Sequence, residues 1–268
     1  MDWRGIGAAL LAVELAVGLA GPAEAGAFTL EHGRTKLFLT GVLNSGDHYF
    51  DADGRLKRRG IYRKYDLQLY GEHGLREGLT VFGSAGLQRI KTKDGASFER
   101  AGLGRTEFGL RAKMFERVGW IGSVQGSAVI AGAKKGPDLA VVGETDDQFD
   151  GRVLVARSFE AFGKPAFVDL AAGYRVRTGD PADEARFDAT FGVRPSPRLL
   201  VMAQSFNTIG VARWRGPYAL RQRIYKLQGA AIYDLTDNWS LIGAAFCTPA
   251  GRDALDERGA TFGVGLKF

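Results

Sequence analysis

Apolar and polar residues alternate along much of this chain with a period of two. Between residues 184 and 194, alanine, phenylalanine and valine fill every second position, and arginine, aspartate and threonine stand between them. The same alternation recurs over residues 102–114 and 259–268. Successive side chains of a β-strand point to opposite faces of the sheet, so this period is typical of strands. Helical spacing is nowhere sustained over several turns, and the pattern predicts an all-β protein.

Segments of this kind, separated by clusters of breaker residues, predict about twelve strands. We expect them over residues 35–44, 61–71, 79–90, 102–114, 120–133, 148–159, 166–177, 184–194, 199–207, 221–233, 239–248 and 259–268. Most are close to the roughly ten residues that a tilted strand needs to cross a bilayer. Strand length therefore favours a transmembrane barrel over a soluble sandwich.

Short and long connections alternate between these segments. The short ones cover residues 73–78, 115–119, 160–165, 195–198 and 235–238. The longer, more polar ones cover residues 45–60, 91–101, 134–147, 178–183, 208–220 and 249–258. Short turns on one side and long loops on the other are the layout of bacterial outer-membrane barrels. The fold expected is an antiparallel up-and-down transmembrane β-barrel, with Gly26 and Phe268 both on the short-turn side.

The alternation also assigns one face of each strand to lipid and the other to the lumen. We place charged residues inward, because an Arg or Lys facing lipid at the midplane costs about 2–4 kcal/mol. The candidate pore lining is Arg105, Glu107, Arg111, Lys113, Arg152, Asp169, Arg175, Arg186, Asp188 and Lys226, with Asp66, Arg177 and Arg194 assigned inward on the same argument. Cations outnumber carboxylates in this set, which predicts an anion preference if the lumen conducts. The pattern leaves the faces of residues 120–133, 199–207 and 239–248 open.

The first 25 residues resemble a secretory signal peptide. Arg4 precedes an apolar run from Ile6 to Ala20, and the small-x-small triplet Ala23–Ala25 follows it. We expect cleavage before Gly26, which leaves residues 26–268 as the barrel; a retained amphipathic anchor is the alternative. The later sequence has no run of about 18 apolar residues, so a membrane-embedded mature protein must be a barrel.

Composition agrees with this interpretation without deciding it. Hydrophobic residues make up 45% of the chain, charged residues 25%, and the mean hydropathy is −0.11. Alternating barrel strands average to such values, because only every second residue faces lipid. The formal net charge is +6, but the cations are dispersed over separate strands, which disfavours nucleic-acid binding. The single cysteine, Cys247, excludes an internal disulfide and a multi-cysteine metal site.

Nothing in the sequence assembles a catalytic or metal site. The three histidines, His32, His48 and His73, are far apart, and only His48 has a serine close in sequence, Ser45. A barrel hydrolase needs a serine beside a base that is itself oriented by a third group. The run from Asp51 to Gly54 begins like a calcium loop but lacks the later glutamate, so an acidic β-turn is preferred. We expect no catalysis, no metal and no cofactor.

Aromatic residues flank several short turns. Trp120 and Trp239 begin strands after such turns, and Phe159 and Tyr233 end strands before them. These positions are those of an interfacial aromatic girdle at the periplasmic rim. Ordinary aromatics of a sheet are the alternative.

The last nine residues, Ala-Thr-Phe-Gly-Val-Gly-Leu-Lys-Phe, alternate apolar and small or polar positions and end in Phe268. This ending resembles the C-terminal signature by which the barrel-assembly machinery recognises outer-membrane proteins. The resemblance implies that this machinery is a partner of the chain and that Phe268 is part of its assembly signal.

A second resemblance covers residues 61–90. The stretch Tyr-Arg-Lys-Tyr-Asp-Leu-Gln-Leu-Tyr-Gly-Glu-His-Gly-Leu-Arg-Glu-Gly-Leu-Thr-Val looks like a strand, turn and strand of the barrels associated with phenol meta-pathway and hydrocarbon uptake. Those barrels usually have an acidic or polar residue after Leu-Thr, a form that appears here at Leu235-Thr236-Asp237. About thirty residues of similarity imply the architecture far better than the substrate class.

These observations predict a passive outer-membrane channel or uptake pore for small solutes, with small anionic or aromatic molecules as candidates. With about twelve strands, the lumen should be narrow or partly occluded. The alternatives are a structural or surface-interaction barrel whose lumen is plugged by its own arginines, and a barrel hydrolase.

Overall fold

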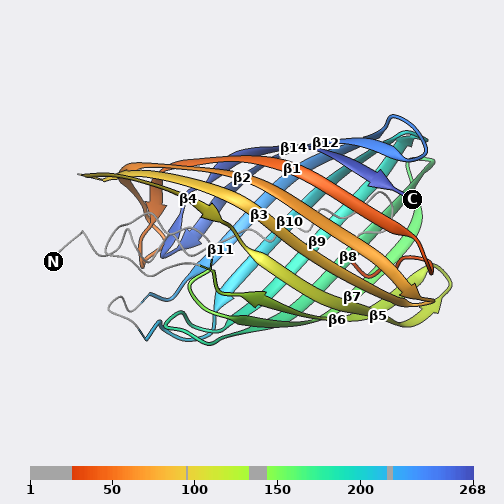
Figure 1. Cartoon of the computed structure of the whole chain (residues 1–268), viewed down its shortest axis with the longest axis horizontal. Helices are drawn as coiled ribbons and strands as arrows, with labels where there is room; N and C mark the ends of the chain where they lie inside the picture. The colour runs from red at the N-terminus through yellow and green to blue at the C-terminus, as the bar shows by residue number, and fades with distance from the viewer. Residues whose placement is uncertain (1–25, 95, 133–143, 216–219) are drawn as a thin grey trace.

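The computed structural model describes residues 26–94, 96–132, 144–215 and 220–268, and within them twelve long strands form a closed antiparallel barrel (Figure 1). The barrel strands are β1 (Thr35–Phe50), β2 (Leu56–Arg76), β3 (Leu79–Asp94), β5 (Thr106–Arg117), β6 (Trp120–Ile130), β7 (Gln148–Ala161), β8 (Lys164–Arg177), β9 (Glu184–Ser196), β10 (Leu199–Gly210), β11 (Arg223–Asp234), β12 (Trp239–Arg252) and β14 (Arg258–Lys267). Two shorter strands, β4 (Ala96–Leu103) and β13 (Ala254–Leu255), are added to this wall. The described residues include no helix long and apolar enough to span a membrane.

The first strand closes the barrel. Each strand pairs with its neighbours in the chain, and β1 pairs with β2 on one side and with β14 on the other. At the seam, Lys36 lies opposite Lys267, and Thr35 and Phe268 exchange two backbone hydrogen bonds of 2.7 and 3.0 Å. The up-and-down barrel predicted from the sequence is confirmed.

Tight turns join the strands at the end of the barrel where the chain terminates (Figure 1). Two of them place a non-glycine residue and then a glycine at positive φ, Val118 (42°) with Gly119 (78°) and Phe162 (55°) with Gly163 (67°). Successive positive φ values are the mark of a two-residue hairpin turn whose twist matches that of the strands. Because Thr35 and Phe268 meet at this end, the barrel strands begin and end on the short-turn side, where Phe268 was predicted, whereas Gly26 lies inside the barrel against Asp169.

Three of the predicted long loops are wrong, because paired strands extend through them. The loop expected over residues 45–60 is reduced to residues 51–55, since β1 continues to Phe50 and β2 begins at Leu56. Residues 91–94 belong to the end of β3 and residues 96–101 to β4, and residues 249–258 contain the end of β12 and all of β13. Beyond the lipid both faces of a strand meet water, so the alternation that reveals strands is lost there. Of the loop expected over residues 134–147, residues 134–143 lie outside the described residues.

Strand β3 changes partners along its length. Residues 79–84 pair with β5, and residues 87–94 pair with β4, which continues into β5 through Gly104 and Arg105. Gly104 N–H donates to the carbonyl of Gly86, 2.9 Å away, at the point of change. The strand predicted over residues 102–114 is therefore two strands with a break at Gly104 and Arg105.

The outer surface of the barrel is apolar at the positions that the alternation assigned to lipid. On β5, the exposed fractions of Phe108, Leu110 and Met114 are 54%, 48% and 65%. Trp120 and Trp239 also face outward at strand ends beside short turns, where a girdle was expected, and the guanidinium of Arg157 lies 5.2 Å from the centre of the Trp120 ring. This exterior is suited to lipid, with aromatic and cationic groups at one rim.

Candidate functional site: the barrel lumen

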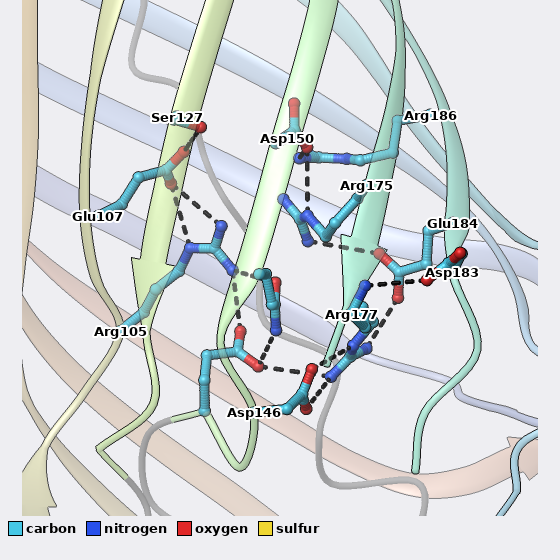
Figure 2. Close-up of polar contacts among 12 residues, drawn as sticks. Arg105, Glu107, Ser127, Asp146, Asp150, Arg175, Arg177, Asp183, Glu184 and Arg186 are labelled. Atoms are coloured by element: carbon cyan, nitrogen blue, oxygen red, sulfur yellow. Dashed lines mark hydrogen bonds and ion pairs between the residues drawn. The ribbon is translucent and has the colours of Figure 1, made fainter. Parts of the chain in front are cut away.

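The inward side chains divide the lumen into two levels. Near the long-loop end, the inward faces of β5 to β9 carry a cluster of buried ion pairs (Figure 2). We call it the lumen charge cluster; it comprises Arg105, Glu107, Glu144, Asp146, Asp150, Arg152, Arg175, Arg177, Glu184, Arg186 and Asp188. Near the short-turn end, the inner wall is mostly apolar.

Asp150, the third residue of β7, lies at the centre of the cluster. Its carboxylate accepts from Arg152 Nε at 2.6 Å, from Arg175 Nε at 3.1 Å and from Arg186 Nη1 at 3.1 Å, so three arginines from three adjacent strands meet on one acid. Figure 2 shows the contacts of Asp150 with Arg175 and Arg186. The Asp150 side chain has no exposed surface. An uncompensated charge at this depth would be very costly, and the three cations remove that penalty.

The remaining acids of the cluster come from β5, from the chain just before β7 and from β9. Arg177 holds Asp146 through two parallel hydrogen bonds and donates to Glu184 at 2.9 Å. Arg105 donates to Glu144 at 2.8 Å and forms an ion pair with Glu107 at 3.1 Å. The planar guanidinium group suits such two-pronged contacts with carboxylates. The ion pairs thus join the wall of β5 to β9 to the segment that enters β7.

The charges of this cluster nearly cancel, which corrects the expected excess of cations over carboxylates at this level of the lumen. Its five arginines face six carboxylates. The acids that sequence reasoning missed are Glu144, Asp146, Asp150 and Glu184. Glu144 and Asp146 precede β7, so strand alternation carries no signal for them. Asp150 and Glu184 stand two residues from inward arginines on the same strands, and that spacing could have identified them.

The opposite wall is less charged. Lys226 of β11 forms a 2.6 Å ion pair with Glu257, and its Nζ lies 5.1 Å from the centre of the Phe246 ring. Next to it, the Gln228 amide donates to Gln204 at 2.8 Å, and the Gln204 amide donates to Thr190 at 3.2 Å. This row of neutral polar groups on β11, β10 and β9 continues the polar level round the barrel. Gln204 and Gln228, which were not among the predicted lumen residues, lie on the inner faces of β10 and β11. The sequence pattern had left the inward face of the β10 segment open.

At the short-turn level the interior is filled by apolar side chains. They form one buried cluster of Phe38, Phe167, Leu200, Met202, Ala230, Ile232, Ile242 and Ala244, with Tyr70 packed against it. Leu200 has no exposed surface and Ile232 has 1%. Interiors packed in this way leave few voids larger than a water molecule, so this level is closed to solutes in the present conformation.

Residues 26–30 lie inside the barrel at this same level, and the exposed residues 31–34 lead from them to the start of β1. The Leu30 N–H donates to Thr80 Oγ1 at 2.8 Å, and Arg111 Nη1 donates to the carbonyl oxygen of Phe28 at 3.0 Å. The Phe28 ring packs edge-on against Phe167. We call residues 26–34 the N-terminal strap. Gly74 of β2 allows its entry, because a Cβ there would lie 2.0 Å from a strap carbonyl oxygen.

The short-turn mouth holds an open recess of about 490 Å³. It is lined by Leu30, Glu31, Arg34, Thr35, Lys36, Arg194, Asp237, Asn238, Lys267 and Phe268. Four cations and two acidic side chains therefore face it. Arg194 belongs to this rim and pairs with Asp234 at 3.5 Å, and Lys113 lies at the same end beside Glu77 and Glu116.

Histidines and serines do not meet in a catalytic arrangement among the described residues. His73 contacts the Thr35 hydroxyl, His32 contacts the carbonyl oxygen of Leu75, and His48 contacts Asp47. No group of three or more metal-ligating side chains occurs in the part of the chain that the structure describes. Asp51 accepts from the backbone N–H groups of Arg55 and Asp53, and these bonds, chiefly that of Arg55, lower its pKa. This geometry is the acidic β-turn preferred above.

Comparisons with known proteins identify the architecture. No family model matches the sequence, and no curated protein matches it. An outer membrane channel from Pseudomonas putida F1 superposes with a TM-score of 0.75 at 15% identity, over 90% of this chain and 97% of that one. The chain has the fold of an outer-membrane channel. The NanC porin (TM-score 0.56, 9% identity) and the KdgM porin (0.53, 8%) each match 87% of this chain and almost all of their own length.

This fold agrees with the resemblance to outer-membrane uptake barrels in the sequence. A closed antiparallel barrel with an apolar exterior and a polar interior is stable with its outer face in lipid, and barrels of this architecture span the bacterial outer membrane. The chain therefore has the architecture of an integral outer-membrane β-barrel.

Proposed function

We propose that this barrel is a narrow, passive channel for small solutes and performs no catalysis. The observation that carries the proposal is the polar level of the lumen, where charged and amide side chains from β5 to β11 line the interior of a barrel with a channel fold. A barrel that needed only to fill its interior could use apolar residues at this level as well, as it does at the short-turn level. Burying polar groups at this level costs desolvation free energy, even though each group has partners. A solute pathway through the lumen would explain why the polar groups are kept.

We further propose that the channel has a weak preference for anions over cations. The lumen charge cluster is close to neutral, so it supplies little net field. The short-turn recess, with Arg34, Lys36, Arg194 and Lys267 against Glu31 and Asp237, carries a cationic excess. Charges at the mouth of a low-dielectric passage concentrate counter-ions at its entrance. Small anionic or aromatic solutes remain the candidate cargo, and the barrel-assembly machinery remains the proposed partner in insertion.

A specific observation also favours a second function, that of a structural or surface-interaction barrel. The apolar cluster and the N-terminal strap close the short-turn level, and the arginines of the upper level are held by carboxylates. In that case the protein would contribute its outer loops and not its lumen.

Single-channel recording in planar bilayers separates the two functions. A channel gives stepwise conductance, small because the lumen is narrow, and a salt gradient gives a reversal potential of the anion-selective sign. Liposome swelling with neutral sugars and with small carboxylates tests the same point without an applied voltage. Absence of conductance together with absence of swelling in correctly folded protein would favour the structural barrel.

A further inference from the structure

A buried carboxylate marks the inner end of the N-terminal strap. Asp169, on the inner face of β8, is 6% exposed. Its Oδ2 accepts a hydrogen bond of 2.8 Å from the backbone N–H of Ala27. Asp188, on the neighbouring strand, is held at 2.7 Å by Arg152, whereas no cationic side chain of the described residues lies within ion-pair distance of Asp169. The carboxylate thus has no ion-pair partner among the described residues, although Arg111, which donates to the Phe28 carbonyl, lies close enough to act on it electrostatically.

The chain itself brings its backbone up to this carboxylate. A Cβ on Gly26 would lie 1.9 Å from Asp169 Oδ1 and 2.3 Å from Oδ2, so both oxygens stand against the Gly26 Cα and any larger residue would displace the carboxylate. The φ of Gly26, 66°, also favours glycine. The Gly26 nitrogen is one bond, about 1.46 Å, from that Cα. Any charge on this nitrogen would therefore be beside the carboxylate.

We propose that cleavage between Ala25 and Gly26 creates this charge, and that the new α-ammonium group of Gly26 binds Asp169 inside the lumen. Hydrolysis of the peptide bond by a signal peptidase consumes one water. It leaves a carboxylate on Ala25 and an amino group on Gly26, and an α-amino group is largely protonated at neutral pH. The uncleaved chain has an uncharged amide at this position and cannot form the ion pair.

The ion pair gives the strap a fixed inner end. Its other end is already held, because Thr35 is bonded to Phe268 at the seam. Between them, the Ser123 hydroxyl donates to the carbonyl of Ala27, and Leu30 donates to Thr80. Processing thereby fastens the strap across the short-turn level of the lumen. This inference concerns processing and the strap, and it does not depend on whether the barrel conducts.

The test uses the mature barrel purified from outer membranes. Mass spectrometry of the intact chain should give Gly26 as the first residue. An amine-reactive reagent, followed by peptide mapping, should leave the Gly26 amine unlabelled in the folded barrel and label it after heat denaturation. In D169N, the amine should be labelled in the folded barrel at a rate near that of the denatured chain. The matched control D188N, which removes an acid that has its own arginine, should protect the amine as the wild type does.

A second variant covers the case in which D169N fails to fold. Insertion of Gly-Ser between Ala25 and Gly26, with cleavage kept before the insertion, leaves every barrel residue intact but moves the ammonium group two residues away from Asp169. Its amine should be labelled in a barrel that still migrates as folded on an unheated gel. A wild-type amine as reactive when folded as when denatured, or a mature chain beginning at another residue, would overturn the proposal.

Discussion

Arg177 and Asp146 form a two-pronged ion pair, with 3.0 Å from Nε to Oδ2 and 2.9 Å from Nη2 to Oδ1, although they are 31 residues apart. Both side chains are only 2% exposed. The pair connects the last residue of β8 to the segment that precedes β7, and it therefore fixes the long-loop end of the lumen to the wall.

Replacing Asp146 with alanine should destabilise the barrel. Removing one partner of a buried ion pair costs about 3–5 kcal/mol, and we expect the lower end because Glu184 remains within 2.9 Å of Arg177. Urea titration in lipid vesicles, read by the heat-modifiable gel shift, measures the change. D147A, at the adjacent residue outside the cluster, removes an exposed hydrogen bond from the Ala131 N–H and no ion pair, so as the control it should cost less. Equal stability of D146A and wild type would contradict the role given to this pair.

Reversing the charge of a lumen side chain should shift the ion selectivity of the channel in a predictable direction. Glutamate in place of Arg111, Arg186 or Lys226 adds negative charge to the wall of a low-dielectric passage, so each variant should shift the reversal potential towards cation selectivity. Glu257→Gln, which removes the acid paired with Lys226, should shift it the other way. A cation preference of the unmodified channel would count against the proposed weak anion selectivity.

The outward face can be tested by placing a charge in lipid. Leu110→Arg, near the middle of β5 on the exposed face, should cost about 2–4 kcal/mol of folding free energy, whereas Met114→Arg, nearer the rim, should cost about 0–1 kcal/mol. Reversible unfolding in lipid vesicles would measure both. A smaller cost at Leu110 than at Met114 would reverse the assignment of faces.

Deleting Phe268 should strongly reduce insertion into the outer membrane. The resemblance to an assembly signal predicts this, and the structure adds a local reason, since Phe268 exchanges two backbone hydrogen bonds with Thr35 at the seam. Phe268→Tyr, which keeps an aromatic ring and the backbone bonds, is the control and should insert normally. Unchanged insertion of the deletion variant, measured by surface protease protection and the folded gel band, would refute the signal.

The barrel itself could be predicted from the sequence because its signal is local. A strand that separates lipid from a polar interior must alternate, and residues 184–194 do so without exception. The ends of the strands could not be predicted, because above the membrane no face is required to be apolar. For this reason the polar run Leu56–Gly60, taken as loop, is the beginning of β2.

The lumen was only partly predictable for a related reason. Alternation placed Arg105, Arg111, Arg152, Arg175, Arg186 and Lys226 on inner faces, and in the structure these side chains have little exposed surface. It could not supply their partners, because an ion pair joins residues from different strands or loops, as Arg105 does with Glu144. Net lumen charge depends on those partners, and so a count of cations on strand faces overstates it.

The closure of the barrel through β1 and β14 also has a consequence for the order of assembly. The strand that completes the wall is the last to leave the ribosome, and its partner, paired at Lys36 and Lys267, is the first strand of the barrel. Contacts between residues so far apart in sequence form slowly, since most of the chain must be ordered before they are gained. Until that moment β1 lacks one neighbour and its unpaired amides cannot be left in lipid. We therefore expect a copy truncated before β14 to leave the wall open beside β1 and to fail to form a stable barrel in lipid.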